Sequence, residues 1–236
     1  MSDARTDMLG RIRRALKRGP LDEKAAAPLA ARLKEHRRNL IPKRAIALDH
    51  RGQVALFMAM AEGVSATVAR VSSAAEVPGA VADYLSRLNL PARLIMAPDP
   101  ALDAIPWAER PLLEIRRGRA EDGDSAGVTA CFAAVAETGT LMLHSGPESP
   151  TRNNFLPDTH IVVLRSRQVV ASYEDCFDNL RRKFAKTEGG ITMPRTVNFI
   201  TGPSRTADIE QKIELGAHGP RRLHIVLIDE GGDGQA

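Results

Sequence analysis

Cysteine is scarce in this chain, which has 236 residues but only two cysteines, Cys131 and Cys176. They lie 45 positions apart, and no CxxC pair is present. An iron–sulfur cluster needs about four thiolate ligands, so this chain cannot hold one by itself. So few cysteines suit a reducing compartment rather than a disulfide-stabilised secreted protein. The sequence therefore predicts a cytoplasmic protein without a cluster of its own.

Long apolar runs are also missing. Charged residues interrupt the longest apolar stretches within a dozen positions, which is too short for a membrane span. The basic N-terminus is not followed by the apolar segment of a secretory signal. We therefore expect no membrane span and no signal peptide.

Two common phosphate-binding signatures are absent as well. The chain has no GxxxxGK[ST] loop and no GxGxxG opening a helix, which disfavours P-loop enzymes and nicotinamide dehydrogenases. The six histidines show no HxH, HExxH or paired Cys/His spacing; they are His36, His50, His144, His160, His218 and His224. We predict no bound metal.

Positive charge is concentrated in the N-terminal part. Residues 1–51 hold 14 Lys/Arg and 6 Asp/Glu, a net charge of +8, whereas residues 52–236 hold 19 and 23, a net charge of −4. Within the basic part, apolar residues recur at helical spacing at Met8, Leu9, Ile12 and Leu16. An Ala-rich stretch through Pro28 is interpreted as a linker before a second basic helix at residues 29–40. Residues 1–49 are thus predicted to form a basic helical arm and linker.

This arm contains no aromatic residues that could stack on bases, so nucleic-acid binding is disfavoured. Interspersed Lys and Arg favour a solvated arm that docks on a more acidic partner.

From residue 50 onward, helical and strand patterns alternate, which predicts a single α/β domain over residues 50–236. Strands are predicted at residues 66–71, 93–97, 112–115, 127–129, 140–144, 160–164, 197–201 and 223–228. Helices are predicted at residues 53–60, 73–88, 131–136, 173–186 and 206–215. This order predicts βαβ crossovers and an open, mostly parallel sheet with helices on both faces.

The turn after the strand at residues 197–201 is the first candidate site. Gly202 and Pro203 break the strand, and Ser204 or Thr206 can cap a helix that ends near Gly216. A helix start presents free N–H groups and a partial positive charge, so an anion can bind there. The predicted anion-binding residues are Gly202, Ser204, Arg205, Thr206 and Asp208. The alternative is an ordinary helix cap that binds nothing.

Two further loops are candidates, since open α/β sheets bind ligands at the carboxyl ends of their strands. The polar segment at residues 145–154 follows one predicted strand and contributes Arg152, a second cation for an acidic ligand. The loop at residues 216–220 precedes its strand, so only an antiparallel strand would bring His218 to the same edge. Its alternative interpretation is a glycine-terminated helix and a turn.

Three motifs in order carry a family resemblance. They are Glu-Thr-Gly-Thr at residues 137–140, Gly-Pro-Ser-Arg-Thr-Ala-Asp-Ile-Glu at residues 202–210, and Gly-Ala-His-Gly-Pro at residues 216–220, followed by Leu-His and Leu-Ile-Asp at residues 223–224 and 227–229. Together they resemble the LUD-domain family, specifically its lactate-utilisation protein C branch, over about residues 50–229. The resemblance implies a fold like that of the ribose-5-phosphate isomerase, CoA-transferase and formyltetrahydrofolate cyclo-ligase group. It also implies iron–sulfur partner proteins and a role in oxidation of L-lactate to pyruvate.

Glu137 is the catalytic candidate. Its motif places a carboxylate next to a flexible glycine, Gly139, with Thr138 and Thr140 on either side as possible anion-binding residues. CoA-transferases carry a nucleophilic glutamate beside a glycine in a comparable motif, so Glu137 is a candidate nucleophile or base. The alternative is a solvated glutamate in a turn.

Three functions stay open at this point. The first is a non-cluster subunit for lactate utilisation that binds a nucleotide-like or other anionic ligand. The second is a stand-alone CoA-transferase-like or cyclo-ligase-like enzyme that uses Glu137. The third is a regulatory or assembly protein without turnover.

Overall fold

The computed structural model describes residues 3–17, 19, 21–38, 40–186, 191–206 and 214–230. The chain divides into two compact units, Met1–Leu40 and Ile41–Ala236. The smaller unit contains two helices, α1 (Ala4–Ala15) and α2 (Glu23–Glu35). Short helix α3 (Lys43–Ile46) belongs to the larger unit.

The two helices of the smaller unit begin at aspartates whose side chains accept backbone hydrogen bonds. Asp3 accepts from the N–H of Arg5, and Asp22 accepts from the N–H of Ala25. None of the described residues of α1 or α2 is buried. Pro28 lies inside α2 rather than in a linker, because the cap at Asp22 starts an Ala-rich run that favours helix. The second helix therefore begins and ends earlier than the predicted residues 29–40.

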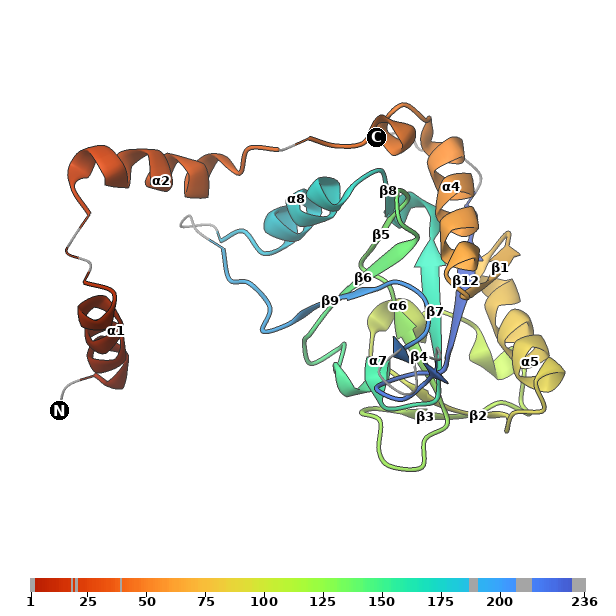
Figure 1. Cartoon of the computed structure of the whole chain (residues 1–236). Helices are drawn as coiled ribbons and strands as arrows, with labels where there is room; N and C mark the ends of the chain where they lie inside the picture. Colours follow the sequence, from red (N-terminus) through yellow and green to blue (C-terminus); the bar gives the residue numbers. More distant parts are fainter. Residues whose placement is uncertain are drawn as a thin grey trace. The chain divides into compact units, whose positions relative to one another are not determined.

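A six-stranded parallel sheet forms the centre of the larger unit (Figure 1). In spatial order its strands are β1 (Thr67–Val71), β12 (Arg222–Ile228), β7 (Thr159–Arg165), β4 (Ala126–Ala130), β2 (Arg93–Met96) and β3 (Glu114–Arg117). Every pairing in this sheet is parallel. The predicted α/β class with an open parallel sheet is confirmed.

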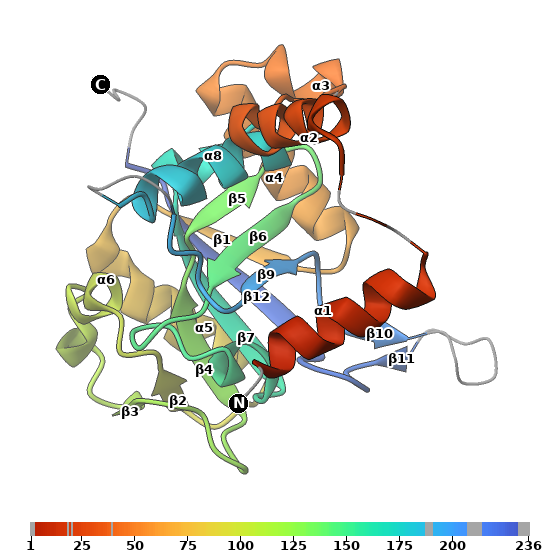
Figure 2. The same ribbon diagram turned by 90° about the vertical axis from the view of Figure 1, so that its left-hand side faces the viewer.

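A second, four-stranded sheet lies over one face of the first, and Figure 2 looks onto it. Its order is β8 (Val169–Val170), β5 (Ala133–Val135), β6 (Thr140–His144) and β9 (Val197–Ile200). The prediction of a single sheet was wrong in this respect, and so was the helix predicted at residues 131–136. That short run of small apolar residues is buried on both faces, and periodicity does not separate a strand from a helix in such a run.

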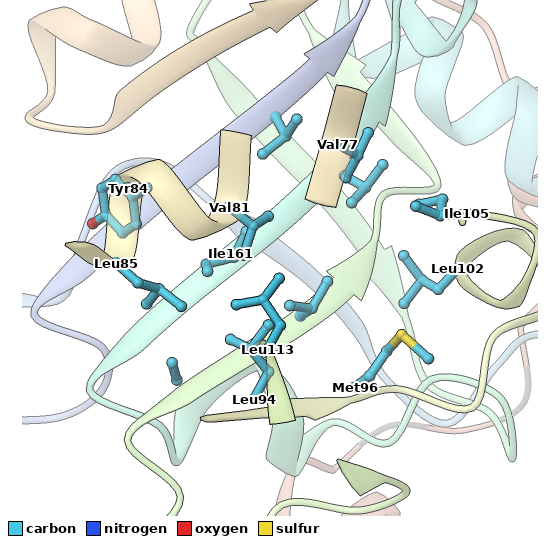
Figure 3. Packing of buried hydrophobic residues seen from close by; sticks show 14 of the residues in the cluster. Val77, Val81, Tyr84, Leu85, Leu94, Met96, Leu102, Ile105, Leu113 and Ile161 are labelled. Atoms are coloured by element: carbon cyan, nitrogen blue, oxygen red, sulfur yellow. The ribbon is translucent and has the colours of Figure 1, made fainter. Parts of the chain in front are cut away.

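Helices cover both faces of the main sheet. On one face, α5 (Val77–Arg87) and α6 (Pro100–Asp103) pack on a core in which Val81 and Leu85 lie near Leu94 and Ile161 (Figure 3). On the other face, α4 (His50–Gly63) packs together with the inner side of the second sheet. Helix α8 (Tyr173–Lys183) covers the outer side of the second sheet. Burial on both faces explains why the central strands are apolar throughout.

The remaining described elements are short: α7 (Arg152–Phe155), β10 (Arg205–Thr206), β11 (Glu214–Leu215), and three 3-10 turns, η1 (Ala74–Glu76), η2 (Trp107–Glu109) and η3 (Ser166–Gln168). Strands β10 and β11 pair antiparallel. The helix predicted at residues 206–215 was therefore wrong at both described ends. The residues between these strands, including Asp208, lie outside the described part of the chain.

Backbone hydrogen bonds explain this outcome. The N–H of Ser204 donates to the carbonyl of Pro220 at 2.8 Å, and the N–H of Gly216 donates to the carbonyl of Ser204 at 2.9 Å. These long-range bonds engage the backbone groups that the sequence assigned to a helix start. Gly216 has a φ of +86°. Glycines adopt a positive φ both in turns and at the ends of helices, so this residue did not distinguish the two structures.

Candidate functional site

The Glu-Thr-Gly-Thr motif forms the turn of the β5–β6 hairpin. Gly139 has a φ of +66°, and a Cβ placed on it would lie 2.3 Å from the backbone nitrogen of Ala61 in α4. The turn therefore packs directly on the helix backbone. Glycine is needed here for close packing against α4, whereas the sequence suggested close approach by a substrate.

Glu137 is half-buried at the start of this turn. Its backbone carbonyl accepts a hydrogen bond from the Arg44 guanidinium at 2.5 Å, and its N–H donates to the carbonyl of Ala171 at 3.3 Å. Among the described residues, none donates a hydrogen bond to the Glu137 carboxylate at normal distance. The backbone of Glu137 is thus held in place while its side chain keeps its acceptor capacity.

Four hydroxyl groups meet beside the turn, and we call them the hydroxyl cluster: Thr138, Thr140, Tyr173 and Thr201. The Thr140 hydroxyl lies 2.7 Å from the hydroxyls of both Thr138 and Thr201 and 3.0 Å from that of Tyr173. Thr138 also donates to Tyr173 at 3.1 Å. The cluster joins the first sequence motif to the end of β9, which leads into the second motif.

The Gly202 turn contacts the same helix. A Cβ on Gly202, whose φ is +73°, would lie 2.3 Å from the carbonyl oxygen of Val64, and the Arg205 guanidinium donates to that same oxygen. Val64 is the C-cap of α4, where carbonyls lack helical partners and a cation is favourable. Arg205 therefore satisfies a helix C-terminus, whereas the sequence placed it beside a helix N-terminus.

The third motif also meets this turn. A Cβ on Gly219 would lie 3.4 Å from the Cβ of Ser204, so the loop that carries the exposed His218 packs against Ser204. The sequence placed these two loops at opposite edges of one sheet. They meet because β9 belongs to the second sheet, and its following turn reaches the amino ends of β1 and β12. The Gly202 turn is therefore not at the carboxyl edge of the main sheet.

Arg152 is engaged elsewhere. Its guanidinium forms an ion pair with Asp122 at 2.6 Å on the surface. Next to it, the Asn153 side chain bonds the N–H of Ala120 at 2.8 Å and the carbonyl of Gly118 at 2.9 Å. Anion binding by the Gly202 turn and by the Glu-Thr-Gly-Thr motif stays a prediction. The reason given for it in the Gly202 turn was the start of a helix, and the described residues Arg205–Thr206 form strand β10 instead.

A cavity of about 660 Å³ opens at the carboxyl ends of β2, β4 and β7. We call it the switch-point cavity, because the chain moves from β2 to β3 in one direction across the sheet and from β4 to β7 in the other. Ligands in open α/β sheets bind at such a point. The sequence predicted a ligand at this edge and named the loop after β6, whose residues 145–149 do line the cavity.

Four cationic side chains line the switch-point cavity: Arg165, Arg167, Lys183 and Arg195. Arg165 and Arg167 both pair with Glu230, the latter at 2.6 Å. Among the described residues, no carboxylate lies within ion-pair distance of Lys183 or Arg195. These two side chains leave a positive charge available to an anion.

His144 lies at the end of β6 and also lines the cavity. Its ring makes edge contacts with Phe132 and Phe184, at centroid distances of 5.2 Å and 5.1 Å. Burial, and secondly the Lys183 ammonium, lower the pKa of His144. The ring is therefore neutral at pH 7, with one nitrogen that donates and one that accepts.

Sequence reasoning missed His144, Lys183 and Arg195 because they come from three separate segments without a common spacing. The structure brings them together through the second sheet. The N–H of Ser145 donates to the carbonyl of Thr196 at 2.9 Å, and the N–H of Thr196 donates to the Ser145 hydroxyl at 2.9 Å, which holds the neighbouring Arg195 near His144. The one available signal was the position of His144 at the end of a predicted strand.

Both cysteines are buried. The Cys131 thiol donates to the carbonyl of Ala133 at 3.0 Å, and burial raises the pKa of both thiols. Neutral, buried thiols are poor metal ligands and poor nucleophiles. Within the described residues, no group of three or more His, Cys, Asp or Glu side chains is arranged to hold a metal ion. No helix in this part of the chain has the length and apolar character to cross a membrane.

Comparison with known proteins gives consistent matches. The LUD domain family model matches residues 54–228. A Lactate utilization protein C from Deinococcus radiodurans is 32% identical over 166 residues, covering 66% of this chain and 70% of that protein. A Lactate utilization protein C from Bacillus subtilis is 32% identical over 106 residues, covering 45% of this chain and 43% of that protein. The chain thus aligns with less than half the length of the second relative.

A solved structure is similar as well. The crystal structure of a DUF162 family protein from Deinococcus radiodurans, at 1.70 Å resolution, superposes with a TM-score of 0.58 and 27% sequence identity. The superposition covers 77% of this chain and 99% of that chain.

Proposed function

This chain belongs to the LUD-domain family, and from that membership we propose that it serves lactate utilisation as a subunit without an iron–sulfur cluster of its own. Its relatives named Lactate utilization protein C support the pathway. Two buried thiols fall short of the four ligands that a cluster needs, which supports partners that carry the clusters. In this proposal those partners oxidise L-lactate to pyruvate in the cytoplasm.

The switch-point cavity is the observation that carries the ligand-binding part of this function. It lies where open α/β sheets bind ligands, and Lys183 and Arg195 line it without a carboxylate partner among the described residues. We propose that it binds an organic anion. Calorimetry with a panel of carboxylates and phosphates tests this, and a protein that binds no member of the panel would contradict it.

Partner docking is assigned to the arm, residues 1–40. In α1 the apolar side chains are solvent-exposed, Met8 by 63% and Ile12 by 48%, while Arg11 and Arg14 supply positive charge. An amphipathic helix with an uncovered apolar side suits a groove on an acidic protein partner. Attraction between the charges would weaken as salt concentration rises.

Deletion of residues 1–40 is therefore expected to weaken co-purification with the iron–sulfur partners about tenfold or more and to slow growth on lactate. The larger unit should keep its melting temperature, because the deleted helices contribute no buried residues among those described. Pull-down from lactate-grown cells at low and high salt measures the effect. Full complementation by the truncated protein would refute the docking role.

The enzyme alternative depends on Glu137. Its carboxylate is half-buried, yet α4 occupies the space beside Gly139 that a substrate would need. We therefore favour the subunit function over a CoA-transferase-like or cyclo-ligase-like activity. A regulatory or assembly protein is the third candidate, and it would bind partners without binding the anion.

The variant Glu137→Gln separates the subunit function from the enzyme activity, because it removes the charge of the side chain and keeps its size. We expect lactate-dependent growth and melting temperature to change little, with growth within about twofold of the parent, since surface substitutions are usually mild. The exposed Glu62→Gln in α4 is the matched control. Loss of growth at an unchanged melting temperature in the first variant alone would establish the enzyme.

A further inference from the structure

We propose that the ligand of the switch-point cavity is a nucleoside phosphate. This inference rests on the proposed function, which assigns an organic anion to the cavity, and it names the chemical class of that anion. Three groups of side chains around the cavity support it: exposed cations, aromatic rings and carboxylates.

The volume argues against lactate itself as the ligand. Pockets for small organic ligands span about 300–1,000 Å³, and they bury most of the ligand surface. At about 660 Å³ the cavity falls in the middle of that range. Lactate would fill a small part of it and leave most of the wall in contact with water. A ligand with several connected parts fits better.

The cations lie next to the rings. The Lys183 ammonium is 5.4 Å from the centroid of Phe132 and 5.9 Å from that of Phe184. Both rings line the cavity and are half-buried, so each keeps an accessible part. A phosphate bound by Lys183 and Arg195 would bring a planar base within reach of these rings, and aromatic side chains bind bases by stacking.

Two carboxylates decide between a nucleotide and a simple anion. Asp99 and Glu148 line the same cavity, and both influence the electrostatic environment of His144. Asp99 uses Oδ1 to accept the N–H of Ala101 at 2.8 Å. Carboxylates repel a bare anion, but they accept hydrogen bonds from ribose hydroxyl groups, as in dinucleotide sites. A ligand with both a phosphate and a sugar satisfies both kinds of side chain.

His144 completes the set. Its neutral ring lies between Phe132 and Phe184, near Lys183, Asp99 and Glu148. Nδ1 lies 3.5 Å from the carbonyl oxygen of Ser145, so Nε2 is the nitrogen left to accept a hydrogen bond from an N–H group of a base.

Calorimetry on the full chain with AMP, ADP and ATP tests the proposal, with adenosine, ribose 5-phosphate, inorganic phosphate and L-lactate as comparisons. We expect a nucleotide to bind at least about tenfold more tightly than ribose 5-phosphate or phosphate, because only the nucleotide offers a base. Lys183→Gln and Glu148→Gln should each weaken the nucleotide by about fivefold or more. Arg93→Gln removes an exposed cation at the amino end of β2 and should change nothing.

The outcomes separate this inference from the proposed function. Equal affinity for phosphate, ribose 5-phosphate and the nucleotides would overturn the nucleoside phosphate while leaving an anion site. Nucleotide binding that survives both cavity substitutions would place the ligand elsewhere and overturn the proposal. If no anion binds the parent protein, both the nucleoside phosphate proposal and the ligand-binding part of the proposed function fail.

Discussion

Gly139→Ala is expected to destabilise the larger unit by about 3 kcal/mol, the sum of roughly 1–2 kcal/mol for a positive φ and about 1–3 kcal/mol for overpacking. A Cβ at this position would lie 2.3 Å from the nitrogen of Ala61 and 2.6 Å from the carbonyl carbon of Met60. Both are backbone atoms, so neither can move aside as a flexible side chain would. The melting temperature should fall by about 6–12 °C in thermal denaturation followed by circular dichroism.

Gly63→Ala is the matched control. Gly63 is the last residue of the same helix, and a Cβ there would meet no atom within 4 Å. It should be neutral or slightly stabilising, because alanine restricts the unfolded chain more than glycine does. A melting temperature of Gly139→Ala within about 1 °C of the parent would contradict the close packing of the β5–β6 turn on α4.

Acid will destabilise the larger unit through two buried histidines. His160 hydrogen-bonds the Thr129 hydroxyl at 2.7 Å through Nε2, and His224 lies 2.8 Å from the Thr67 hydroxyl through Nδ1. The His224 ring also stacks on Tyr84 at 3.8 Å. Burial lowers the pKa of His160 to about 3, and burial followed by the Arg87 charge lowers the pKa of His224 to about 4.

The direction follows from proton uptake. The unfolded chain binds a proton at each histidine near pH 6.5, whereas the folded chain stays neutral there until about pH 4 or below. The stability that these rings contribute is therefore complete above pH 6.5 and is lost as the pH falls through the window from 6.5 to about 4 for His224 and to about 3 for His160. Each histidine should reduce the free energy of unfolding by about 1.4 kcal/mol per pH unit in that window.

Urea denaturation at pH 7.5, 6.0 and 5.0 measures this slope. His160→Gln and His224→Gln should each make the slope shallower by about 1.4 kcal/mol per pH unit, because each removes one titrating group. Parallel slopes for the parent and both buried variants would show that these histidines do not govern acid stability.

The sequence was sufficient for the main sheet. The strands predicted at residues 160–164 and 223–228 correspond to β7 and β12. Their apolar runs are continuous because both faces are buried, and the helices between strands require parallel pairing. The order and composition of the three motifs were also enough to indicate the family, and the match to the LUD domain confirms it.

Two strands of the second sheet, β6 and β9, were predicted at residues 140–144 and 197–201, but β5, β8 and the separation of these strands into a second sheet were not. In β5 only three residues pair, with β6 on one side and β8 on the other, and β8 lies more than 30 positions away. At Thr206 and Leu215 the helix-like pattern gave way to strand pairing and to long-range bonds from Ser204. Short segments of this kind take the structure that their distant partners impose.

For the site, the sequence by itself determined which residue types are available: two cysteines, a basic N-terminal arm and three ordered motifs. Only the tertiary structure decided that Gly139 and Gly202 serve packing against α4 and that Arg205 binds the carbonyl of Val64. It also assembled the switch-point cavity from His144, Lys183 and Arg195. The physical reason is that backbone preferences and charge are local properties, whereas a cavity depends on contacts between segments whose separation in sequence carries no periodic signal.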